Sequence, residues 1–469
     1  MSRIELSPPV PIRPELDPGF LPAALWNRAY RERVAAAPDA RPLRIALARP
    51  DGTCFVREER ILPAGAAPEL DLRFVERLVK GMLWDLGGSR LYLAGAPEIA
   101  AALARTYAAG GDRAFDDETI GRRIFGEPLR VRACAADELP PARAAAAPLG
   151  RHWQGCRIGF DLGGSDRKCA AVIDGEVVHS EEVPWDPYFQ ADPDYHLAGI
   201  QDSLARAAAH LPRVDAIGGS AAGVYVGNEV RVASLFRGVP PDRFESEVRR
   251  IFPRLRERWG GVPFEVVNDG EVTALAGSMS LGVNALLGVA LGTSTAAGWC
   301  DEHGHIGAGL TELAFSPVDL RPDAPADEWS GDRGCGVQYL SQQAVARLAP
   351  AAGIELPAGL PPAERLVAVQ ERVARGDDAA RSVFRTIGVY LGYAVAHWAE
   401  TWPLRHLLLL GRVTSGEGGA ILRDQAARVL AEVFPELAER VRLHLPDEKA
   451  KRHGQAVAAA SLPASPPPE

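Results

Sequence analysis

The chain has 469 residues, of which 47% are hydrophobic, and a formal net charge of −9 at pH 7. This length predicts two or three domains, and the apolar content is sufficient for their cores. The acidic balance argues against nucleic acid as the main partner, because phosphate backbones bind to basic surfaces.

The distribution of cysteines and the length of the apolar runs indicate the cellular compartment. The six cysteines are scattered without a C-x-x-C pair, so neither a zinc knuckle nor a disulfide framework is indicated. The opening "MSRIELSPPVPIRPELDPGF" lacks the apolar core of a signal peptide, and the run "ALLGVALGTSTAAGW" is too short and too polar to span a bilayer. We therefore expect a cytoplasmic protein without a membrane segment.

The first third of the chain predicts a small separate domain. Residues 1–40 are rich in proline and are expected to form an arm. Residues 41–150 follow as an α/β domain that begins with a hairpin and continues into an amphipathic helix over 73–86. The stretch 138–150, rich in alanine and proline, predicts a linker.

Residues 151–460 predict a larger α/β domain, followed by a disordered proline-rich tail over 461–469. Strands are expected at 157–162, 168–174, 176–183, 214–223, 229–235, 263–269, around 292–298, and at 406–411 and 440–445. Helices are expected near 195–210, 241–258, 270–281, over much of 336–402, and at 451–461. Strands and helices alternate in two groups, which predicts two lobes.

Three glycine-bearing turns each follow an apolar strand. They are "DLGGS" at 161–165, "LGTSTAAG" at 291–298 and "LGRVTSGEGG" at 410–419. Backbone N–H groups in such turns can surround phosphate oxygens, and Ser165, Thr293 and Ser294 add hydroxyl donors. Asp161 can hold Mg²⁺, or a water bound to it, near the same phosphates. Any one turn is more simply a tight connection, but the three together favour a nucleotide site.

The stretch "VVNDGEVTAL" at 266–275 contains a candidate general base. Asp269 ends a buried strand and opens a helix, so its carboxylate can point into a cleft and remove a proton from an alcohol. The alternative is that Asp269 is a helix N-cap, which is a common position for aspartate. For this motif alone, capping is the simpler interpretation.

Taken together, "IGFDLGGSDRKCAAVIDGE", "GGSAAGVY", "NDGEVTALAG", "ALGTSTAAGW" and "LGRVTSGEGGAIL" resemble the ROK family of sugar kinases, within the actin, Hsp70 and hexokinase superfamily. The resemblance covers about residues 156–460. It implies a two-lobed, actin-like (ribonuclease H-like) ATPase fold, here with an extra N-terminal α/β domain. In such kinases the double-glycine hairpin covers the ATP phosphates, which explains why two glycines occur together in "DLGGS".

The resemblance also implies roles for particular residues. Mg·ATP is expected in the cleft between the lobes, and Asp269 is expected to accept the proton of the acceptor hydroxyl, with Asn268 and Glu312 orienting that acceptor. Lys168 falls where hexokinases place a basic residue near the phosphates, although a solvated strand residue is an equally simple interpretation. The expected ATP-binding residues are Asp161, Gly163, Gly164, Ser165, Lys168, Gly292, Thr293 and Ser294, with Gly411 and Gly416 bordering the adenosine.

The acceptor half departs from the family pattern. Family members carry Glu-x-Gly-His and then a cysteine cluster that binds zinc; here Glu312 is followed by Ala314 and Phe315 at the Gly-His positions. Cys335 is the single cysteine of the cluster motif, and Val337 occupies the place of its usual glutamate. No zinc is therefore expected.

Two further positions bear on the acceptor half. Ser234 stands where the family has an asparagine that contacts the sugar. His303 and His305 could be replacement metal ligands, but two solvated histidines in a surface hairpin are the simpler interpretation.

The sequence thus predicts an ATP- and Mg²⁺-dependent kinase that acts on a sugar or polyol, without nucleic acid or membrane partners and with a homodimer as a possible assembly. Two alternatives stay open. One is a non-catalytic ROK-like protein that binds a sugar or a nucleotide and has a regulatory role. The other is a carbohydrate kinase of the FGGY type, whose second phosphate turn also reads Gly-Thr-Ser.

Overall fold

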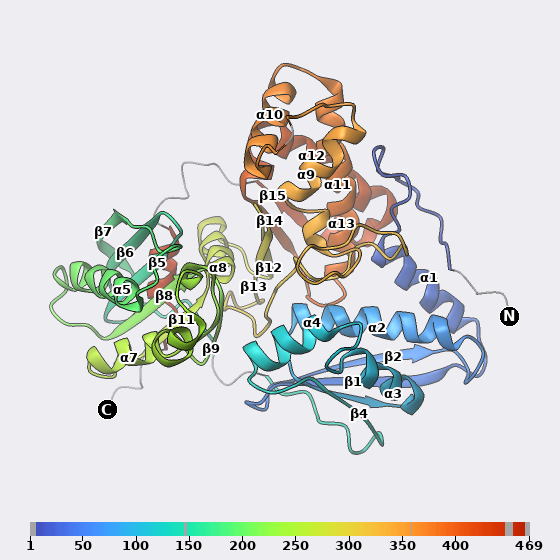
Figure 1. The fold of residues 1–469 in the computed structure, drawn as a ribbon, viewed down its shortest axis with the longest axis horizontal. Helices are drawn as coiled ribbons and strands as arrows, with labels where there is room; N and C mark the ends of the chain where they lie inside the picture. The colour runs from blue at the N-terminus through green and yellow to red at the C-terminus, as the bar shows by residue number, and fades with distance from the viewer. Residues whose placement is uncertain (1–5, 145–147, 358, 446–453, 465–469) are drawn as a thin grey trace. The chain divides into compact units, whose positions relative to one another are not determined.

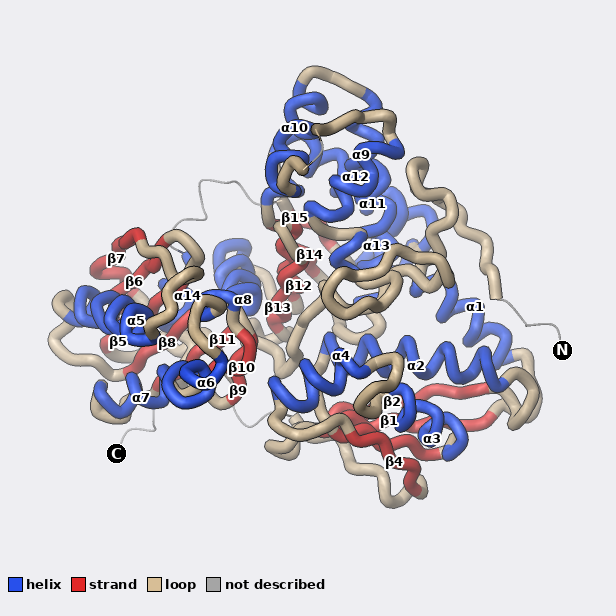
Figure 2. The backbone as a smooth tube through the Cα atoms, in the orientation of Figure 1, coloured by secondary structure: helices blue, strands red, loops and turns tan. Residues whose placement is uncertain are grey.

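The computed structural model describes residues 6–144, 148–357, 359–445 and 454–464. The chain divides into two compact units, and each of them is built from several segments. Unit 1 comprises Met1–Ala144, Val289–Ala296 and Gly309–Leu445, and unit 2 comprises Ala145–Gly288, Ala297–Ala308 and Pro446–Glu469. Figure 1 labels the elements along the chain, and Figure 2 distinguishes helices, strands and loops.

Unit 1 begins with a helix inside the range that was expected to be an arm. Helix α1 (Ala23–Ala35) follows Pro22, and Trp26, Tyr30 and Val34 are buried along it at a spacing of four residues. This spacing places the three side chains on one helical face.

A four-stranded sheet with helices on it follows α1. The elements are β1 (Arg41–Ala48), β2 (Cys54–Ile61), α2 (Pro68–Asp85), β3 (Arg90–Ala94), α3 (Pro97–Thr106), α4 (Ala114–Asp116), the π-helix η1 (Asp117–Ile124) and β4 (Arg130–Cys134). The strand order is β2-β1-β3-β4. Helix α2 lies along this sheet in Figure 1. The helix predicted over 73–86 is confirmed, and it starts earlier, at Pro68, because proline is favourable in a first turn.

The second part of unit 1 is mainly helical. Its elements are η4 (Gly336–Gln338), α9 (Gln342–Ala351), α10 (Pro362–Ala374), α11 (Asp378–Trp398), β14 (His406–Leu410), η5 (Arg412–Thr414), α12 (Gly416–Val433), α13 (Pro435–Arg440) and β15 (Arg442–His444). Strands β14 and β15 join β12 (Leu286–Leu291) and β13 (Thr295–Cys300) in a sheet of order β13-β12-β14-β15. The turn of the β12–β13 hairpin belongs to unit 1.

Unit 2 contains a five-stranded sheet of order β11-β8-β5-β6-β7. Its elements are β5 (Cys156–Leu162), β6 (Asp166–Ile173), β7 (Glu176–Pro184), α5 (Pro193–Ala208), β8 (Ala216–Ala221), β9 (Val224–Val226), β10 (Glu229–Val232), η2 (Ser234–Phe236), α6 (Pro241–Arg243), the π-helix η3 (Phe244–Val248), α7 (Ile251–Arg258), β11 (Phe264–Asn268), α8 (Asp269–Leu281) and α14 (Gly454–Ala460). The helix expected over 241–258 is thus divided into three short pieces.

Both faces of this sheet are covered by helices. Ile158, Phe160 and Leu162 of β5 point into a core shared with residues of α5 and α7. Gly159 of the same strand faces the other way, and a Cβ there would collide with the backbone of α14. Strands β11, β8 and β5 run parallel, so their carboxyl ends meet at one edge. That edge carries the candidate site residues of unit 2.

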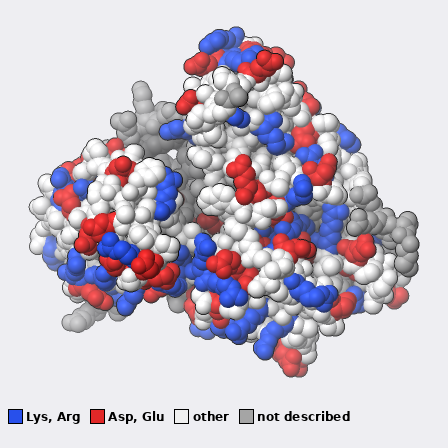
Figure 3. Space-filling model, viewed as in Figure 1, with Lys and Arg blue, Asp and Glu red and all other residues white. Residues whose placement is uncertain are grey.

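Several predictions fall partly outside the described residues: positions 1–5 of the arm, 145–147 of the linker, 451–453 of the last helix and 465–469 of the tail. Ser461 and Leu462, at the start of the predicted tail, are buried. None of the helices among the described residues is long and apolar enough to cross a membrane. On the face shown in Figure 3, basic and acidic side chains are interspersed.

Candidate active site

The double-glycine stretch forms the turn between β5 and β6. The turn is closed by a hydrogen bond of 2.9 Å from the Gly163 amide to the Asp166 carbonyl, and the Trp185 indole donates to the Gly163 carbonyl at 2.8 Å. Neither Gly163 nor Gly164 has a positive φ. Gly164 is required by packing instead, because a Cβ there would collide with the Tyr188 hydroxyl.

A buried carboxylate lies just before this turn. Asp161 is 4% exposed, and the Ser220 hydroxyl on the neighbouring strand β8 donates to it at 2.6 Å. Lys168, which pairs with Asp161 in the β5–β6 register, lies 3.6 Å from its carboxylate and 2.6 Å from that of Asp166. Burial raises the pKa of Asp161 above its usual value, although the hydrogen bond from Ser220 opposes this shift.

Asp269 is the first residue of α8, and the N-cap of that helix is its neighbour. The Asn268 side-chain oxygen accepts from the Gly270 amide at 2.7 Å, and the Asn268 amide group donates to the Gly223 carbonyl at 2.7 Å. The Asp269 carboxylate also accepts from the Gly270 amide, at a longer 3.0 Å. Capping is therefore performed mainly by Asn268, and it does not by itself account for an aspartate at 269.

The electrostatic environment of Asp269 favours a proton acceptor that works near neutral pH. Burial, followed by the nearby charge of Asp161, raises the pKa of Asp269 to about 6. The Tyr225 hydroxyl donates to the Ala222 carbonyl at 3.1 Å, and burial, followed by the charge of Asp269, raises its pKa. A carboxylate with a pKa close to the working pH is both ionised and basic enough to take a proton.

The second predicted turn, in unit 1, is exposed and lightly packed. Thr293 and Ser294 are exposed, and a Cβ on Gly292 would meet a single atom, the Ser294 carbonyl oxygen at 3.7 Å. Gly292 has no positive φ, so the fold of the chain itself does not require glycine there. The open space beside this glycine fits the close approach of a ligand such as a phosphate.

Helix α9 begins beside this turn. The Gln342 amide, at the first position of the helix, donates to the Gly292 carbonyl at 2.9 Å, and Ser341 is the N-cap. The amino end of a helix favours anions because its N–H groups and dipole point outward. No motif in the sequence of α9 indicates that this helix begins beside the turn at 291–298.

The third predicted turn lies against the second. Gly411 has a φ of +89°, and a Cβ there would collide with the Leu291 carbonyl oxygen at the end of β12. Gly416, the first residue of α12, has a φ of +66°. Backbone conformation accounts for glycine at both positions, so the expected contacts with adenosine remain a proposal.

Ser234 and Glu312 occupy different units. Ser234 is exposed and opens the short helix η2. The preceding Ala233 packs against Gly223, the residue whose carbonyl accepts from Asn268. Glu312 is half-buried in unit 1, and its amide donates to the Trp84 carbonyl at 2.9 Å. Within unit 2 the structure therefore connects Ser234 with Asn268, and within unit 1 it places Glu312 on the end of α2.

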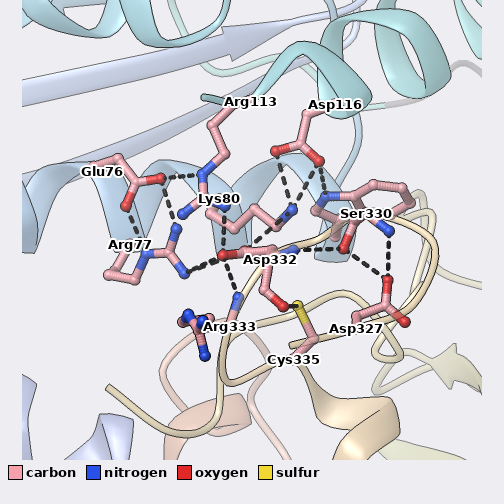
Figure 4. Close-up of polar contacts among 11 residues, drawn as sticks. Glu76, Arg77, Lys80, Arg113, Asp116, Asp327, Ser330, Asp332, Arg333 and Cys335 are labelled. Carbon is pink, nitrogen blue, oxygen red and sulfur yellow. Dashed lines mark hydrogen bonds and ion pairs between the residues drawn. The ribbon is translucent and has the colours of Figure 1, made fainter. Parts of the chain in front are cut away.

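A buried charge network occupies the region around Cys335. Its six charged members, here called the ion network, are Glu76, Arg77, Lys80, Arg113, Asp116 and Asp332. The Lys80 ammonium is fully buried and lies 2.7 Å from the Asp116 carboxylate and 3.4 Å from that of Asp332. Arg77 and Arg113 also pair with Asp332, as Figure 4 shows.

These residues do not fit a zinc ion. The Cys335 thiol is fully buried, and its Sγ lies 3.8 Å from the Asp332 carbonyl oxygen. The Lys80 ammonium already neutralises Asp332 and would repel a divalent cation. Among the described residues there is no group of three or more His, Cys, Asp or Glu side chains placed to hold a metal. His303 is 72% exposed in its surface turn.

The substituted family positions near Cys335 form a small apolar core. Ala314, Cys335 and Val337 are buried together, and the Phe315 ring packs against them. Phe315 also stacks on Trp84 of α2 at 4.2 Å between ring centroids. Phe315, at a position where the resemblance implies a polar residue, thus packs against the N-terminal part of unit 1.

Comparisons with known proteins identify the fold. No protein-family model matches the sequence, and no curated protein matches it significantly. Among solved structures, a ROK hexokinase from Thermus thermophilus aligns with a TM-score of 0.50 and 19% identity, covering 65% of this chain and 97% of that chain. The chain therefore has the α/β, actin-like ATPase fold of ROK sugar kinases with additional N-terminal sequence, and the predicted fold class is confirmed.

Two further solved structures are similar. A ROK family glucokinase from Streptomyces griseus, in complex with glucose and AMPPNP, gives a TM-score of 0.47 and 21% identity over 65% of this chain and 98% of that chain. A ROK family transcriptional regulator, a homolog of the E. coli MLC protein, gives a TM-score of 0.49 and 20% identity over 65% of this chain and 77% of that chain.

Proposed function

We propose that the protein is an ATP-dependent kinase that phosphorylates a hydroxyl group of a sugar or a sugar-like polyol. The observation that carries this proposal is the buried environment and the raised pKa of Asp269. Its pKa is raised to about 6, it lies near Asp161, and Asn268 performs the capping of α8. The fold shared with a ROK hexokinase supports the same conclusion.

In the proposed reaction Asp269 accepts the proton of the acceptor hydroxyl while the acceptor oxygen bonds to the γ-phosphorus of ATP. The bond between that phosphorus and the β–γ bridging oxygen breaks, and ADP leaves with the electron pair. Magnesium, when bound, would neutralise charge on the phosphates, and Asp161 would hold it through a water. Asn268 and Ser234 in unit 2, and Glu312 in unit 1, are proposed to contact the acceptor.

The nucleotide contacts are proposed as two sets, one in each unit. Gly163, Gly164, Ser165 and Lys168 would meet the phosphates from the β5–β6 hairpin. The proposed residues of unit 1 are Gly292, Thr293 and Ser294 for the phosphates and Gly411 and Gly416 for the adenosine. The exposed hydroxyls of Thr293 and Ser294 and the open space beside Gly292 support this assignment.

The test is ADP release by the full-length protein with Mg·ATP across hexoses, amino sugars, pentoses, polyols and sugar acids. Asp269→Asn keeps a hydrogen-bonding side chain of similar shape but cannot take the proton. Its turnover should fall by about 10²-fold or more, with an unchanged dissociation constant for ATP measured by calorimetry. Turnover that survives in Asp269→Asn removes this residue from the mechanism. Binding of ATP without turnover on any acceptor supports the non-catalytic alternative.

A further inference from the structure

One arginine near the phosphate hairpin has no carboxylate partner. Arg237 follows the short helix η2, and its side chain is exposed. Its guanidinium carbon lies 4.1 Å from the ring centroid of Tyr188 and 5.0 Å from that of Phe189. Across the described residues no hydrogen bond or ion pair engages this guanidinium.

Several other arginines of the same unit are neutralised, although Arg258 at the exposed end of α7 also has no carboxylate partner among the described residues. Each of the following pairs with an Asp or Glu: Arg167, Arg206, Arg213, Arg243 and Arg249. Arg237 instead lies over two aromatic rings, which hold its plane by cation–π attraction and leave its N–H groups free for a ligand. What distinguishes this position is that the free donors are held over two aromatic rings.

The aromatic residues below Arg237 are fixed in place. The Tyr188 ring packs against Gly164 of the hairpin, where a Cβ would collide with it. A Cβ on Gly238 would lie 2.8 Å from the Phe189 carbonyl carbon, so the turn after Arg237 packs against the same loop. Phe189 itself is 76% exposed, and it offers an aromatic face beside the guanidinium.

A buried histidine joins the two segments. His196 is fully buried, and its Nε2 lies 3.0 Å from both the Pro187 and the Leu235 carbonyl oxygens. Carbonyl oxygens only accept, so Nε2 carries the hydrogen and donates to both. This shared bond fixes the loop that carries Tyr188 and Phe189 to the turn that carries Arg237, and the position of the guanidinium is set before a ligand arrives.

The turn that bears Arg237 also leads to the candidate base. Ser234 lies three residues earlier, and Ala233 packs against Gly223. The Gly223 carbonyl accepts from Asn268, the residue before Asp269. Arg237 is thus connected to the hairpin through Tyr188 and to Asp269 through the turn that contains Ser234.

We propose that Arg237, supported by Tyr188 and Phe189, forms a subsite for an oxyanion that is part of the acceptor, so that the acceptor is an acidic sugar or polyol. This inference rests on the proposed kinase function. A guanidinium can bind either a carboxylate or a phosphate through two parallel hydrogen bonds. The exposed face of Phe189 offers an apolar surface to the C–H groups of the same molecule.

Matched pairs of acceptors test the proposal with the full-length protein. The pairs are glucose with glucuronate and glucitol with gluconate, and glucose 6-phosphate tests a phosphate in place of a carboxylate. The acid of at least one pair should show a kcat/KM about tenfold or more above its neutral partner. The proposal is overturned if glucose and glucitol are each turned over at least as well as the corresponding acid and glucose 6-phosphate is not a substrate.

The variant Arg237→Gln should raise the KM for the preferred acid about 10- to 100-fold, with a smaller change in kcat and an unchanged KM for ATP. The conservative Arg237→Lys should show an intermediate effect, because an ammonium cannot form the two parallel bonds. Arg258→Gln, at an exposed arginine at the end of α7, is the matched control and should change neither KM. An increase in the KM for ATP alone would assign Arg237 to the nucleotide and overturn the proposal.

Binding separates this proposal from the kinase function. Calorimetry with glucuronate, gluconate and glucose 6-phosphate in the absence of ATP measures the subsite without turnover. If the wild-type protein binds an acid, Arg237→Gln does not bind it, and no acceptor is turned over, then the subsite is supported and the kinase function is rejected. If the wild-type protein binds none of the acids while it phosphorylates a neutral sugar, the kinase stands and the subsite is wrong.

Discussion

The proposed phosphate turns and the ion network differ in whether their polar groups are paired. In the turn at 292–294 the hydroxyls of Thr293 and Ser294 are exposed and the space beside Gly292 is open. In the ion network every charged group is paired, and the cation at its centre, Lys80, is fully buried. Polar groups that await a ligand stay unpaired, whereas those with a structural role are satisfied within the chain.

Packing within unit 1 accounts for the apolar residues in the region that is proposed to bind the acceptor. The positions where the family has polar residues hold Phe315 and Val337, and these pack into a small core beside α2. The charges of the ion network occupy the neighbouring space. The side chains of this region are therefore part of the packing of unit 1, whereas the hydroxyls of the turn at 292–294 stay exposed.

The largest expected effect is on stability, in Lys80→Met. The substitution leaves Asp116 and Asp332 buried without their central cation, so the free energy of unfolding should fall by about 3–5 kcal/mol. Urea denaturation measures it, with Arg206→Met as control, since an exposed ion pair such as Arg206–Asp202 contributes little to stability. The double variant Lys80→Met/Asp116→Asn should recover part of the loss. Equal small losses in Lys80→Met and Arg206→Met would contradict a structural role for the network.

The second effect concerns the pH dependence of activity. Asp269 acts in its ionised form, and its pKa is about 6, so kcat/KM should fall about tenfold per pH unit below that value and level off above it. A profile that is flat between pH 5 and about 8 would argue against an aspartate base.

The same shift has a consequence for stability that can be measured separately. The folded state binds the Asp269 proton more tightly than the unfolded chain does, so ionisation of Asp269 lowers stability as the pH rises from 3.8 to about 6. Asp269→Asn should therefore keep or raise the melting temperature at pH 7. A clear loss of stability would instead indicate that Asp269 contributes to capping.

The third prediction compares two glycines. Gly292→Ala should change the free energy of unfolding by less than about 0.5 kcal/mol, because its Cβ meets one atom at 3.7 Å, yet raise the KM for ATP about tenfold. Gly411→Ala has to take a φ of +89° and displace the Leu291 carbonyl, so it should lose more than about 1 kcal/mol. If both variants lose the same stability, Gly292 is structural as well.

The fourth prediction concerns the boundary expected near residue 150. We propose that this boundary separates an N-terminal α/β domain over 41–150 from a kinase-type domain over 151–460. Limited proteolysis should cut within 138–150. The two fragments should then stay associated on gel filtration, because Lys80 and Arg77 pair with Asp332. Cleavage in other loops without cleavage there would contradict the boundary.

The smallest expected effect is that of chelation. The buried Cys335 thiol and the Lys80 ammonium leave no zinc ligand set among the described residues, so EDTA should shift the melting temperature by less than about 1 °C. Elemental analysis that finds one tightly bound zinc per chain would contradict a purely structural role for the ion network and Cys335.

Much of unit 2 could be predicted from its sequence. The strands near 157–162, 168–174 and 176–183 were expected from apolar alternation and glycine turns, and they are confirmed. The strand–helix boundary expected between Asp269 and Gly270 lies one residue earlier, between Asn268 and Asp269. These signals are local, because each depends on a few consecutive residues. The expected roles of the site residues remain predictions.

Other features could not be read locally. Arg77 and Asp332 are 255 residues apart, and nothing in either sequence segment indicates that they meet. The π-helices at 117–124 and 244–248 have no simple periodicity that distinguishes them from α-helix. Helix α1 was not expected, because the prolines around it favoured an extended arm. The spacing of Trp26, Tyr30 and Val34 in the sequence is nevertheless that of one helical face.

The discontinuity of unit 1 has a consequence for the newly synthesised chain. Lys80, Arg77 and Arg113 leave the ribosome with the first 144 residues, whereas Asp332 belongs to the segment 309–445. At a synthesis rate of about 5–20 residues per second, Asp332 follows Lys80 by roughly 10–50 s. During that interval the early segment contains three cations and lacks one of their carboxylates, while the contiguous part of unit 2 is already available for folding. Completion of unit 1 must therefore wait until nearly the whole chain has been made.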